Sequence, residues 1–423
     1  MKYILEKLKN GVRLVLCPMR ETRSVTMGVW IGVGGRYETD ALCGVSHFLE
    51  HMLFKGTKTR TAVQISQAIE GVGGSMNAFT TEETTCFYAK VMNEHFGQAF
   101  EVLADMVENA AFRPQDIEKE RGVILEELRM NLDVPAHYVF ELLGRVMWPK
   151  HPLGRMLIGS EKTIRGLKRS DFLKFKNENY TARNIVISIA GRMDVDHVLK
   201  EASQRFNFLD EKEGALKFLP VVEHQVKPQY QVHSKKTEQT HFCIGIRAFH
   251  RNHPDRFALR VLNAALGENM SSRLFQVIRE KLGLSYDISS TIERFSDTGS
   301  LVISAGVTKG RLNQALEGTL RELEKFKKKL LSKDELNMVK EYCIGQTALG
   351  MEKTSNQMVY MGESELCSGQ ILSLDELLRR MRAVTAEDVE RVAHTVFTNE
   401  RLNLSVVGPM VKEKEIANLF RLN

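Results

Sequence analysis

Several classes of protein are excluded by what the sequence lacks. The 423 residues contain no apolar run approaching the roughly eighteen residues that a membrane-spanning helix needs. The N-terminal stretch MKYILEKLKNGVRLVL interleaves charges where a signal peptide needs an uninterrupted apolar core, so we expect no targeting segment and no membrane association. The net charge of +6 comes without a Lys/Arg block, a zinc-finger pattern or an RNA-binding signature, so we expect no nucleic-acid partner.

Cysteine usage indicates a reducing compartment. The six cysteines are scattered, include no C-x-x-C pair, and all but Cys367 lie in apolar-patterned segments. Buried, reduced thiols are the expected state, which favours a cytoplasmic location. With 43% apolar and 26% charged residues, the composition is that of a globular protein, and the length fits two to four domain-sized units.

The chain repeats itself at a nearly constant offset of about 215 residues. Segment 22–36 matches 237–251, the segment from Glu83 matches the segment from Asp297, and 181–191 matches 398–408. Each half shows strands followed by long helices rather than a regular strand–helix alternation. We therefore predict an α+β fold of two homologous domains, each a mostly antiparallel sheet with helices on one face. The predicted boundaries are 1–208 for the first domain, 209–229 for a charged, proline-bearing linker, and 230–423 for the second domain.

Local signals position elements in the first half. Asn10-Gly11 between two apolar stretches predicts a hairpin. Glycines following residues 41–55 and 61–70 predict the ends of two helices, and further helices are expected at about 93–110 and 116–132.

Two histidines lie four residues apart in GVSHFLEHMLFKGT (residues 44–57), with Glu50 directly before the second. On a helix, His47 and His51 project from the same face one turn apart, as two ligands of one tetrahedral ion must. Glu50 is then near enough to take a proton from a water molecule at that ion without being a ligand. The H-x-x-E-H pattern predicts half of a catalytic zinc site. The alternative is an amphipathic helix that tolerates two histidines.

A third ligand is expected elsewhere, because a catalytic zinc ion usually takes three from the protein. In residues 116–133, Glu126 falls on a polar stripe and is expected at the surface. Glu127 adjoins the apolar stripe that contains Ile124, where an ionised carboxylate needs a metal or an equivalent partner. We predict Glu127 as the third ligand and Glu120, two turns earlier, as a carboxylate that orients a ligating histidine. The alternative for both glutamates is a solvated acidic face.

With HFLEH followed by ERGVILEEL, the chain resembles the pitrilysin/insulinase family of zinc peptidases over essentially its whole length. The likeness is to the short, two-domain branch that includes bacterial and mitochondrial processing-peptidase-like proteins. The resemblance implies that His47, His51 and Glu127 bind one Zn²⁺ per chain. It also implies that Glu50 is the general base and that Glu120 is an accessory glutamate.

A substrate-binding strand is also implied by the resemblance. GGSMNAFTTEET (residues 73–84) is similar to the edge strand on which the family holds an extended peptide, with Asn77, Ala78 and Phe79 pairing with it. The alternative is an ordinary sheet edge.

The second half lacks the metal ligands, since the matching segment ALRVLNAALGENM contains no histidine. It retains RLFQVIREKLGLSYDI, which is similar to the family's Arg/Tyr element, carried here by Arg279 and Tyr286. The implied role of this pair is to close over the substrate and donate hydrogen bonds to its backbone or to the developing oxyanion. Taken alone, Arg279 is an ordinary surface arginine.

The function predicted is that of a zinc metalloendopeptidase acting on short unstructured peptides or precursor segments. By resemblance, two chains form a clam-shell around a closed chamber, so a homodimer is expected. One alternative is a non-proteolytic scaffold or assembly subunit of the same fold. Another is a narrow processing peptidase, although a net charge of +6 does not show the acidic chamber that basic presequences favour. A metal-storage or non-peptide hydrolase role is the remotest alternative.

Overall fold

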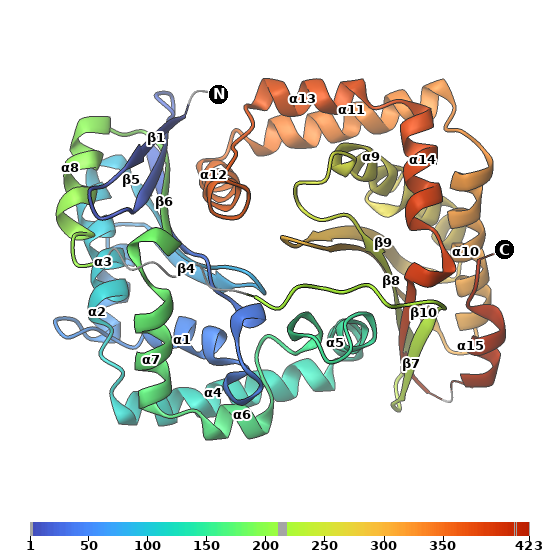
Figure 1. Cartoon of the computed structure of the whole chain (residues 1–423), viewed down its shortest axis with the longest axis horizontal. Coiled ribbons are helices and arrows are strands. Elements are labelled where there is room, and N and C mark those ends of the chain that lie inside the picture. Colours follow the sequence, from blue (N-terminus) through green and yellow to red (C-terminus); the bar gives the residue numbers. More distant parts are fainter. Residues whose placement is uncertain (1–2, 210–217, 410, 412, 423) are drawn as a thin grey trace. The chain divides into compact units, whose positions relative to one another are not determined.

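The structure, a computed structural model, describes residues 3–209, 218–409, 411 and 413–422 (Figure 1). The chain divides into two compact units, each assembled from three separate segments. Unit 1 comprises Met1–Arg129, Arg155–Leu219 and Leu349–Leu374, and unit 2 comprises Met130–Gly154, Pro220–Ala348 and Asp375–Asn423. The boundaries that follow from the sequence repeat stay a prediction, and residues 210–217 of the predicted linker lie outside the described residues.

Unit 1 is built on a six-stranded sheet in the order β1-β2-β6-β3-β5-β4, in which only β2 and β6 are parallel neighbours. Its strands are β1 (Ile4–Lys7), β2 (Arg13–Pro18), β3 (Ser24–Ile31), β4 (Ser75–Thr80), β5 (Thr85–Met92) and β6 (Ile185–Gly191). Its helices are α1 (Val45–Leu53), α2 (Ala62–Glu70), α3 (Phe96–Asn109), α4 (Pro114–Asp133, with the residues from Met130 on assigned to unit 2), α6 (Glu161–Gly166), α7 (Arg169–Asn179), α8 (Val195–Arg205) and α12 (Thr354–Ser368).

Unit 2 has a five-stranded sheet in the order β7-β11-β8-β10-β9, in which only β7 and β11 are parallel neighbours. Its strands are β7 (Gln229–Ser234), β8 (Gln239–Ala248), β9 (Ser285–Arg294), β10 (Gly299–Thr308) and β11 (Leu402–Gly408). Its helices are α5 (Pro135–Met147), α9 (Arg256–Gly267), the π-helical segment Phe275–Lys281, α10 (Leu312–Lys328), α11 (Lys333–Gly350), α13 (Leu374–Ala383), α14 (Ala386–Val396) and α15 (Glu413–Leu419).

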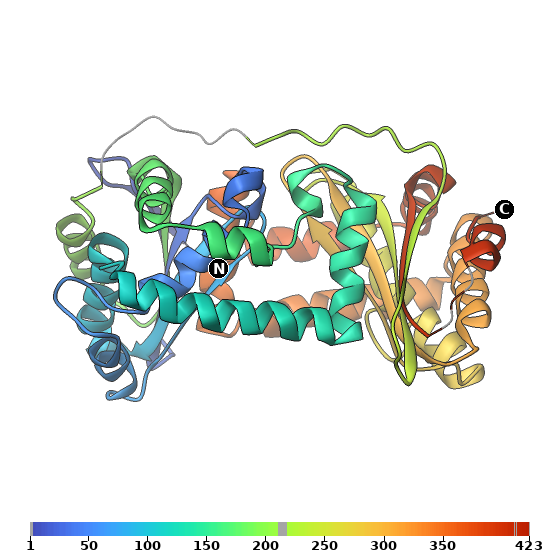
Figure 2. The same ribbon diagram turned by 90° about the horizontal axis from the view of Figure 1, so that it is seen from below.

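The two sheets confirm the predicted internal repeat and the α+β class. The three matched segments become β3 and β8, β5 and β10, and β6 and β11. These pairs occupy corresponding places in the two sheets, because the strand order β6-β3-β5-β4 of the first sheet matches the strand order β11-β8-β10-β9 of the second. The hairpin predicted at Asn10-Gly11 joins β1 and β2, and Gly11 takes the positive φ of 99° that favours glycine. Figure 2 shows α4, in teal, as one uninterrupted helix.

Each sheet also carries a helix on the face opposite its main helical layer. In unit 1, α12 packs on β6 and β3, where buried Met358 and Met361 meet Trp30. Thr26 Oγ1 and Thr354 Oγ1 are 2.8 Å apart, and Ser188 Oγ donates to the Met358 carbonyl at 2.8 Å. Strand alternation places these residues opposite the side chains that face α1 and α3. The physical reason is that β3 and β6 carry mostly apolar side chains on both faces, so both faces need cover from solvent.

In unit 2, α5 is the helix on the opposite face of the sheet and packs on β11 and β8. Its apolar side contributes Val139, Leu142, Leu143 and Met147 to a cluster with Cys243 and Val407 of the sheet, and Ser405 Oγ donates to the Val139 carbonyl at 2.7 Å. The main core of unit 2 lies on the other face, under α9, α10 and α14.

The remaining compositional predictions concern cysteines and membranes. All six cysteines are free thiols, and five of them are buried. Within the part of the chain that the structure describes, none of the helices is both long and apolar enough to cross a bilayer.

Candidate metal centre

The helix that carries the H-x-x-E-H pattern is fixed at its N-terminus by a buried carboxylate. Glu38 Oε2 accepts from the Gly44 amide and Glu38 Oε1 accepts from the Ser46 amide, both at 2.7 Å. These amides are among the N–H groups that a helix start leaves without intrahelical partners. Burial raises the pKa of Glu38 to about 7, although both backbone hydrogen bonds act in the opposite direction.

Glycine is required where α1 begins. Gly44 has a φ of 93°, and a Cβ there would lie 2.5 Å from the Ile158 carbonyl oxygen. From this start, α1 buries Phe48, Leu49 and Met52 in the core. The Phe48 and Phe172 rings pack edge to face, with their centroids 4.7 Å apart. The buried side fixes the rotation of α1, so His47, Glu50 and His51 are left on its remaining face.

His47, His51 and Glu127 lie together with their potential ligand atoms all within 4.8 Å of one another. His47 Nε2 is 3.7 Å from Glu127 Oε1, and His51 Nε2 is 3.7 Å from Glu127 Oε2. The two imidazole rings have centroids 4.7 Å apart. Among the residues that the structure describes, no other group of three or more His, Cys, Asp or Glu side chains has this metal-binding arrangement.

The spacing of these atoms fits a tetrahedral zinc ion. Zn–N and Zn–O bonds of about 2.0–2.2 Å place neighbouring ligand atoms roughly 3.3–3.6 Å apart, close to the observed 3.7 Å. Burial, and secondarily the neighbouring His51, lowers the pKa of His47 to about 4, so its imidazole is neutral at physiological pH. A neutral imidazole is the form that ligates a metal. His47 Nδ1 is buried without a hydrogen-bond partner among the described residues.

Glu120 is placed two turns before Glu127 on α4 and touches the second histidine. Its Oε1 lies 2.9 Å from His51 Nδ1, and its Oε2 lies 2.6 Å from Lys55 Nζ. Burial acts to raise the pKa of Glu120, but the hydrogen bonds from His51 and Lys55 outweigh it and the pKa lies below its usual range. Glu126, by contrast, is 71% exposed, as the polar stripe of α4 predicts.

Glu50 lies next to the edge strand of the sheet. Thr80, the last residue of β4, donates its hydroxyl hydrogen to Glu50 Oε2 at 2.5 Å. Burial raises the pKa of Glu50, and this effect exceeds the opposing one of the Thr80 hydrogen bond. The contact ties the predicted base to the predicted peptide-binding strand.

The predicted substrate strand is at the edge of the sheet in unit 1, because β4 is last in the strand order and, among the described strands, pairs with β5 alone. Phe79 turns to the face of Trp30, with ring centroids 5.4 Å apart, and alternation turns Ala78 and Thr80 to the face that carries α1. The Ala78 amide donates to Asn77 Oδ1 at 2.8 Å. A peptide strand that accepts from this amide has to replace the Asn77 side chain.

Arg279 and Tyr286 lie together in unit 2. The guanidinium carbon of Arg279 is 4.9 Å from the centre of the Tyr286 ring and 4.5 Å from that of Phe275. Arg279 lies on the π-helical segment and Tyr286 at the start of β9, with 79% of the tyrosine exposed. Their action on a substrate stays a prediction.

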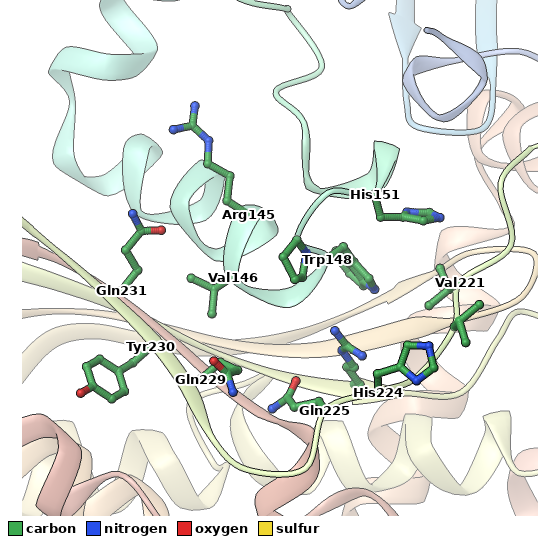
Figure 3. Close-up of a pocket in the computed structure, with 13 residues that line it drawn as sticks. Arg145, Val146, Trp148, His151, Val221, His224, Gln225, Gln229, Tyr230 and Gln231 are labelled. Atoms are coloured by element: carbon green, nitrogen blue, oxygen red, sulfur yellow. The ribbon is translucent and has the colours of Figure 1, made fainter. Parts of the chain in front are cut away.

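A separate cavity of about 490 Å³ opens in unit 2 (Figure 3). The last turn of α5 and the residues after it form one side, with Val146 and Trp148, and the segment leading into β7 forms the other, with His224 and Gln225. None of the described residues that line it carries a carboxylate. None of the predicted site residues belongs to its lining.

Comparisons with known proteins place the chain in a family. Residues 14–161 match the family described as Insulinase (Peptidase family M16), and residues 166–343 match the Peptidase M16 inactive domain. An uncharacterized zinc protease of Streptomyces coelicolor is 38% identical over 97% of this chain and 90% of its own length. This chain belongs to the insulinase family of peptidases, M16. An uncharacterized zinc protease of Bacillus subtilis is 37% identical, with 95% of this chain and 97% of the relative covered.

A solved structure shares the architecture. A protease from Helicobacter pylori superposes with a TM-score of 0.91 at 23% identity, covering 96% of this chain and 99% of the other. The division between an M16 domain and an inactive one agrees with the position of His47, His51 and Glu127, all of which lie within the first match.

Three residues of the site were missed by the reasoning from sequence. Lys55 follows His51 by four residues, the same spacing that singled out the two histidines, so a signal for it was present. Thr80 and Glu38 approach α1 only through the fold, from the edge strand and from the loop before the helix. No local pattern points to either.

Proposed function

We propose that this M16 chain is a zinc metalloendopeptidase that hydrolyses peptide bonds in short unstructured peptides or precursor segments. The observation that carries the proposal is the set of His47, His51 and Glu127 ligand atoms beside Glu50, itself hydrogen-bonded to the edge strand β4. The names of the relatives as zinc proteases support the same reaction class.

The chemistry divides between the metal and Glu50. When bound by His47, His51 and Glu127, zinc supplies Lewis acidity for water and for the peptide carbonyl. Glu50 accepts the proton of the attacking water and passes it to the leaving amine. Thr80 holds the carboxylate of Glu50 in place through its hydroxyl. Because Glu50 is not in the ligand group, Glu50→Gln is expected to bind the metal and to lose catalytic activity.

An extended peptide adds to β4 as a further strand in this proposal. The free edge of β4 offers backbone groups for pairing, and its last residue contacts the catalytic base. A folded substrate has to unfold before it supplies such a strand, so unstructured peptides are preferred. Arg279 and Tyr286 are proposed to close over the bound peptide, and two chains to enclose it as a homodimer. The mass of the particle in solution tests the last point.

The test of function is mass spectrometry of a mixed pool of unstructured peptides of about 10 to 40 residues, a length that an edge strand accommodates. The wild type is expected to cut many of them, a chelator to stop the cutting, and Glu50→Gln to be inactive. Cutting that persists in Glu50→Gln contradicts the proposed mechanism.

Two alternatives give different results in the same experiment. A single cut near one defined motif favours a narrow processing peptidase. A chain that binds no zinc and cuts nothing favours a scaffold or assembly subunit. The intact ligand group argues against the scaffold, since a structural role needs no such group.

A further inference from the structure

Glu120 is held from both sides, although only one of its contacts is with a metal ligand. Its side chain is 3% exposed, and its two oxygens have different partners, His51 Nδ1 at 2.9 Å and Lys55 Nζ at 2.6 Å. A buried carboxylate requires a paired charge or hydrogen bonds to offset its desolvation. Lys55 supplies the positive charge in this pair.

The position of Lys55 follows from the helix that carries the histidines. Lys55 comes two residues after the end of α1, and its amide donates to the Met52 carbonyl at 3.1 Å, which continues the helical turn. It follows His51 by four residues, so both side chains extend toward the same part of α4. The Lys55 side chain is 36% exposed, whereas the carboxylate that it contacts is buried.

We infer that Lys55 is a positioning residue that acts through Glu120 on His51, and the inference rests on the proposed zinc site. The contacts of Glu120 with His51 Nδ1 and with Lys55 Nζ use different carboxylate oxygens, so together they restrain rotation of the carboxylate. With the carboxylate locked, Nδ1 of His51 is engaged and Nε2 is turned to the space shared with His47 and Glu127. A hydrogen-bonded partner on the far nitrogen fixes the orientation and tautomer of a ligating histidine.

The two other ligands lack this arrangement. His47 Nδ1 has no hydrogen-bond partner among the described residues, and Glu127 is 34% exposed. The orientation of the centre therefore depends on His51, and through it on the Glu120–Lys55 pair. A substitution of Lys55 is therefore expected to lower the zinc affinity, although Lys55 itself contacts neither zinc nor peptide.

The test measures the zinc dissociation constant by chelator competition in four proteins: wild type, Lys55→Met, Glu120→Gln and the double variant. Loss of a partner that orients a ligand typically costs about 10–100-fold in metal affinity, and we expect Lys55→Met to lie near the lower end. In the Glu120→Gln background, Lys55→Met is expected to change nothing further, because the neutral amide forms no ion pair. Lys55→Arg is expected to restore most of the affinity.

Controls separate positioning from folding and from the proposed activity. Lys58→Met removes an exposed lysine three positions away and is expected to leave zinc affinity unchanged. Unfolding curves of the zinc-free proteins establish that each variant is folded, and Lys55→Gln replaces Lys55→Met where that variant is not. On a peptide that the wild type cuts, kcat is expected to fall while KM is retained.

The inference is overturned by zinc affinity within about twofold of wild type in Lys55→Met, well below the roughly tenfold loss expected. It is also overturned if Lys55→Met lowers the zinc affinity by the same factor in the wild type and in Glu120→Gln, because independent residues behave additively. A wild type that binds zinc but cuts no peptide contradicts the proposed function alone, since the affinity comparison does not depend on cleavage.

Discussion

Removing the Glu38 carboxylate is expected to destabilise unit 1 and loosen the helix that carries the histidines. Glu38 is 5% exposed and accepts the Gly44 and Ser46 amides, each at 2.7 Å. Glu38→Ala leaves both amides without a partner in a buried site. Each unsatisfied donor costs about 1–3 kcal/mol, so the expected loss is about 2–6 kcal/mol.

The two tryptophans make the assay specific to a unit, because Trp30 belongs to unit 1 and Trp148 to unit 2. In a Trp148→Phe background, urea unfolding followed by fluorescence reports on Trp30, which is 1% exposed. Glu38→Gln keeps one acceptor and is expected to lose about half as much, while exposed Glu21→Ala serves as the matched control. A Glu38→Ala loss within about 0.5 kcal/mol, typical of surface substitutions, refutes this account of the N-terminus of α1.

Three further changes have expected outcomes. Thr80→Val removes the hydroxyl that binds Glu50 and is expected to lower kcat about tenfold, the equivalent of about 1.4 kcal/mol, with zinc retained; activity as low in Thr80→Ser contradicts this. Gly362→Ala drives a methyl group into the Trp30 ring and is expected to cost about 1–3 kcal/mol in the fluorescence assay, and an unchanged curve contradicts the packing of α12. Burial, and secondarily Lys58, lowers the pKa of Lys176 from 10.5 to about 8. Below pH 8 the charged Lys176 side chain therefore lowers the free energy of unfolding, and this destabilisation is lost as the pH rises from 8 to 10.5. Lys176→Met is therefore expected to be more stable than wild type at pH 7 by a margin that shrinks between pH 8 and 10.5, and a margin that grows contradicts the assignment.

Much of the fold was predictable because its signals are local or repeated. The offset between halves identified β3 with β8 and β6 with β11, and the glycines after α1 and α2 marked where those helices end. The helices on the second face of each sheet were not predicted, since α12 and α5 come from segments far along the chain from the strands that they cover. Both strands are mostly apolar, a composition typical of strands buried on both faces, but the sequence does not show which segment covers the second face.

The His47, His51 and Glu127 group was accessible from sequence for a similar reason. The spacing of His47 and His51 is a property of one helix, and the apolar stripe of α4 distinguished Glu127 from Glu126. Thr80 reaches Glu50 from a neighbouring strand, a contact that depends on how α1 packs on the sheet. Tertiary contacts of this kind carry no periodicity along the chain.

The most direct test of the central claim compares the cleavage rate of one peptide by wild type and Glu50→Gln after the zinc content of each has been measured. The account predicts one zinc ion per chain in both proteins and a rate lower by about 10²–10⁴-fold in the variant, the usual contribution of a general base. Equal rates at equal zinc content would contradict the assignment of Glu50, and loss of zinc from Glu50→Gln would show that this carboxylate belongs to the metal centre itself.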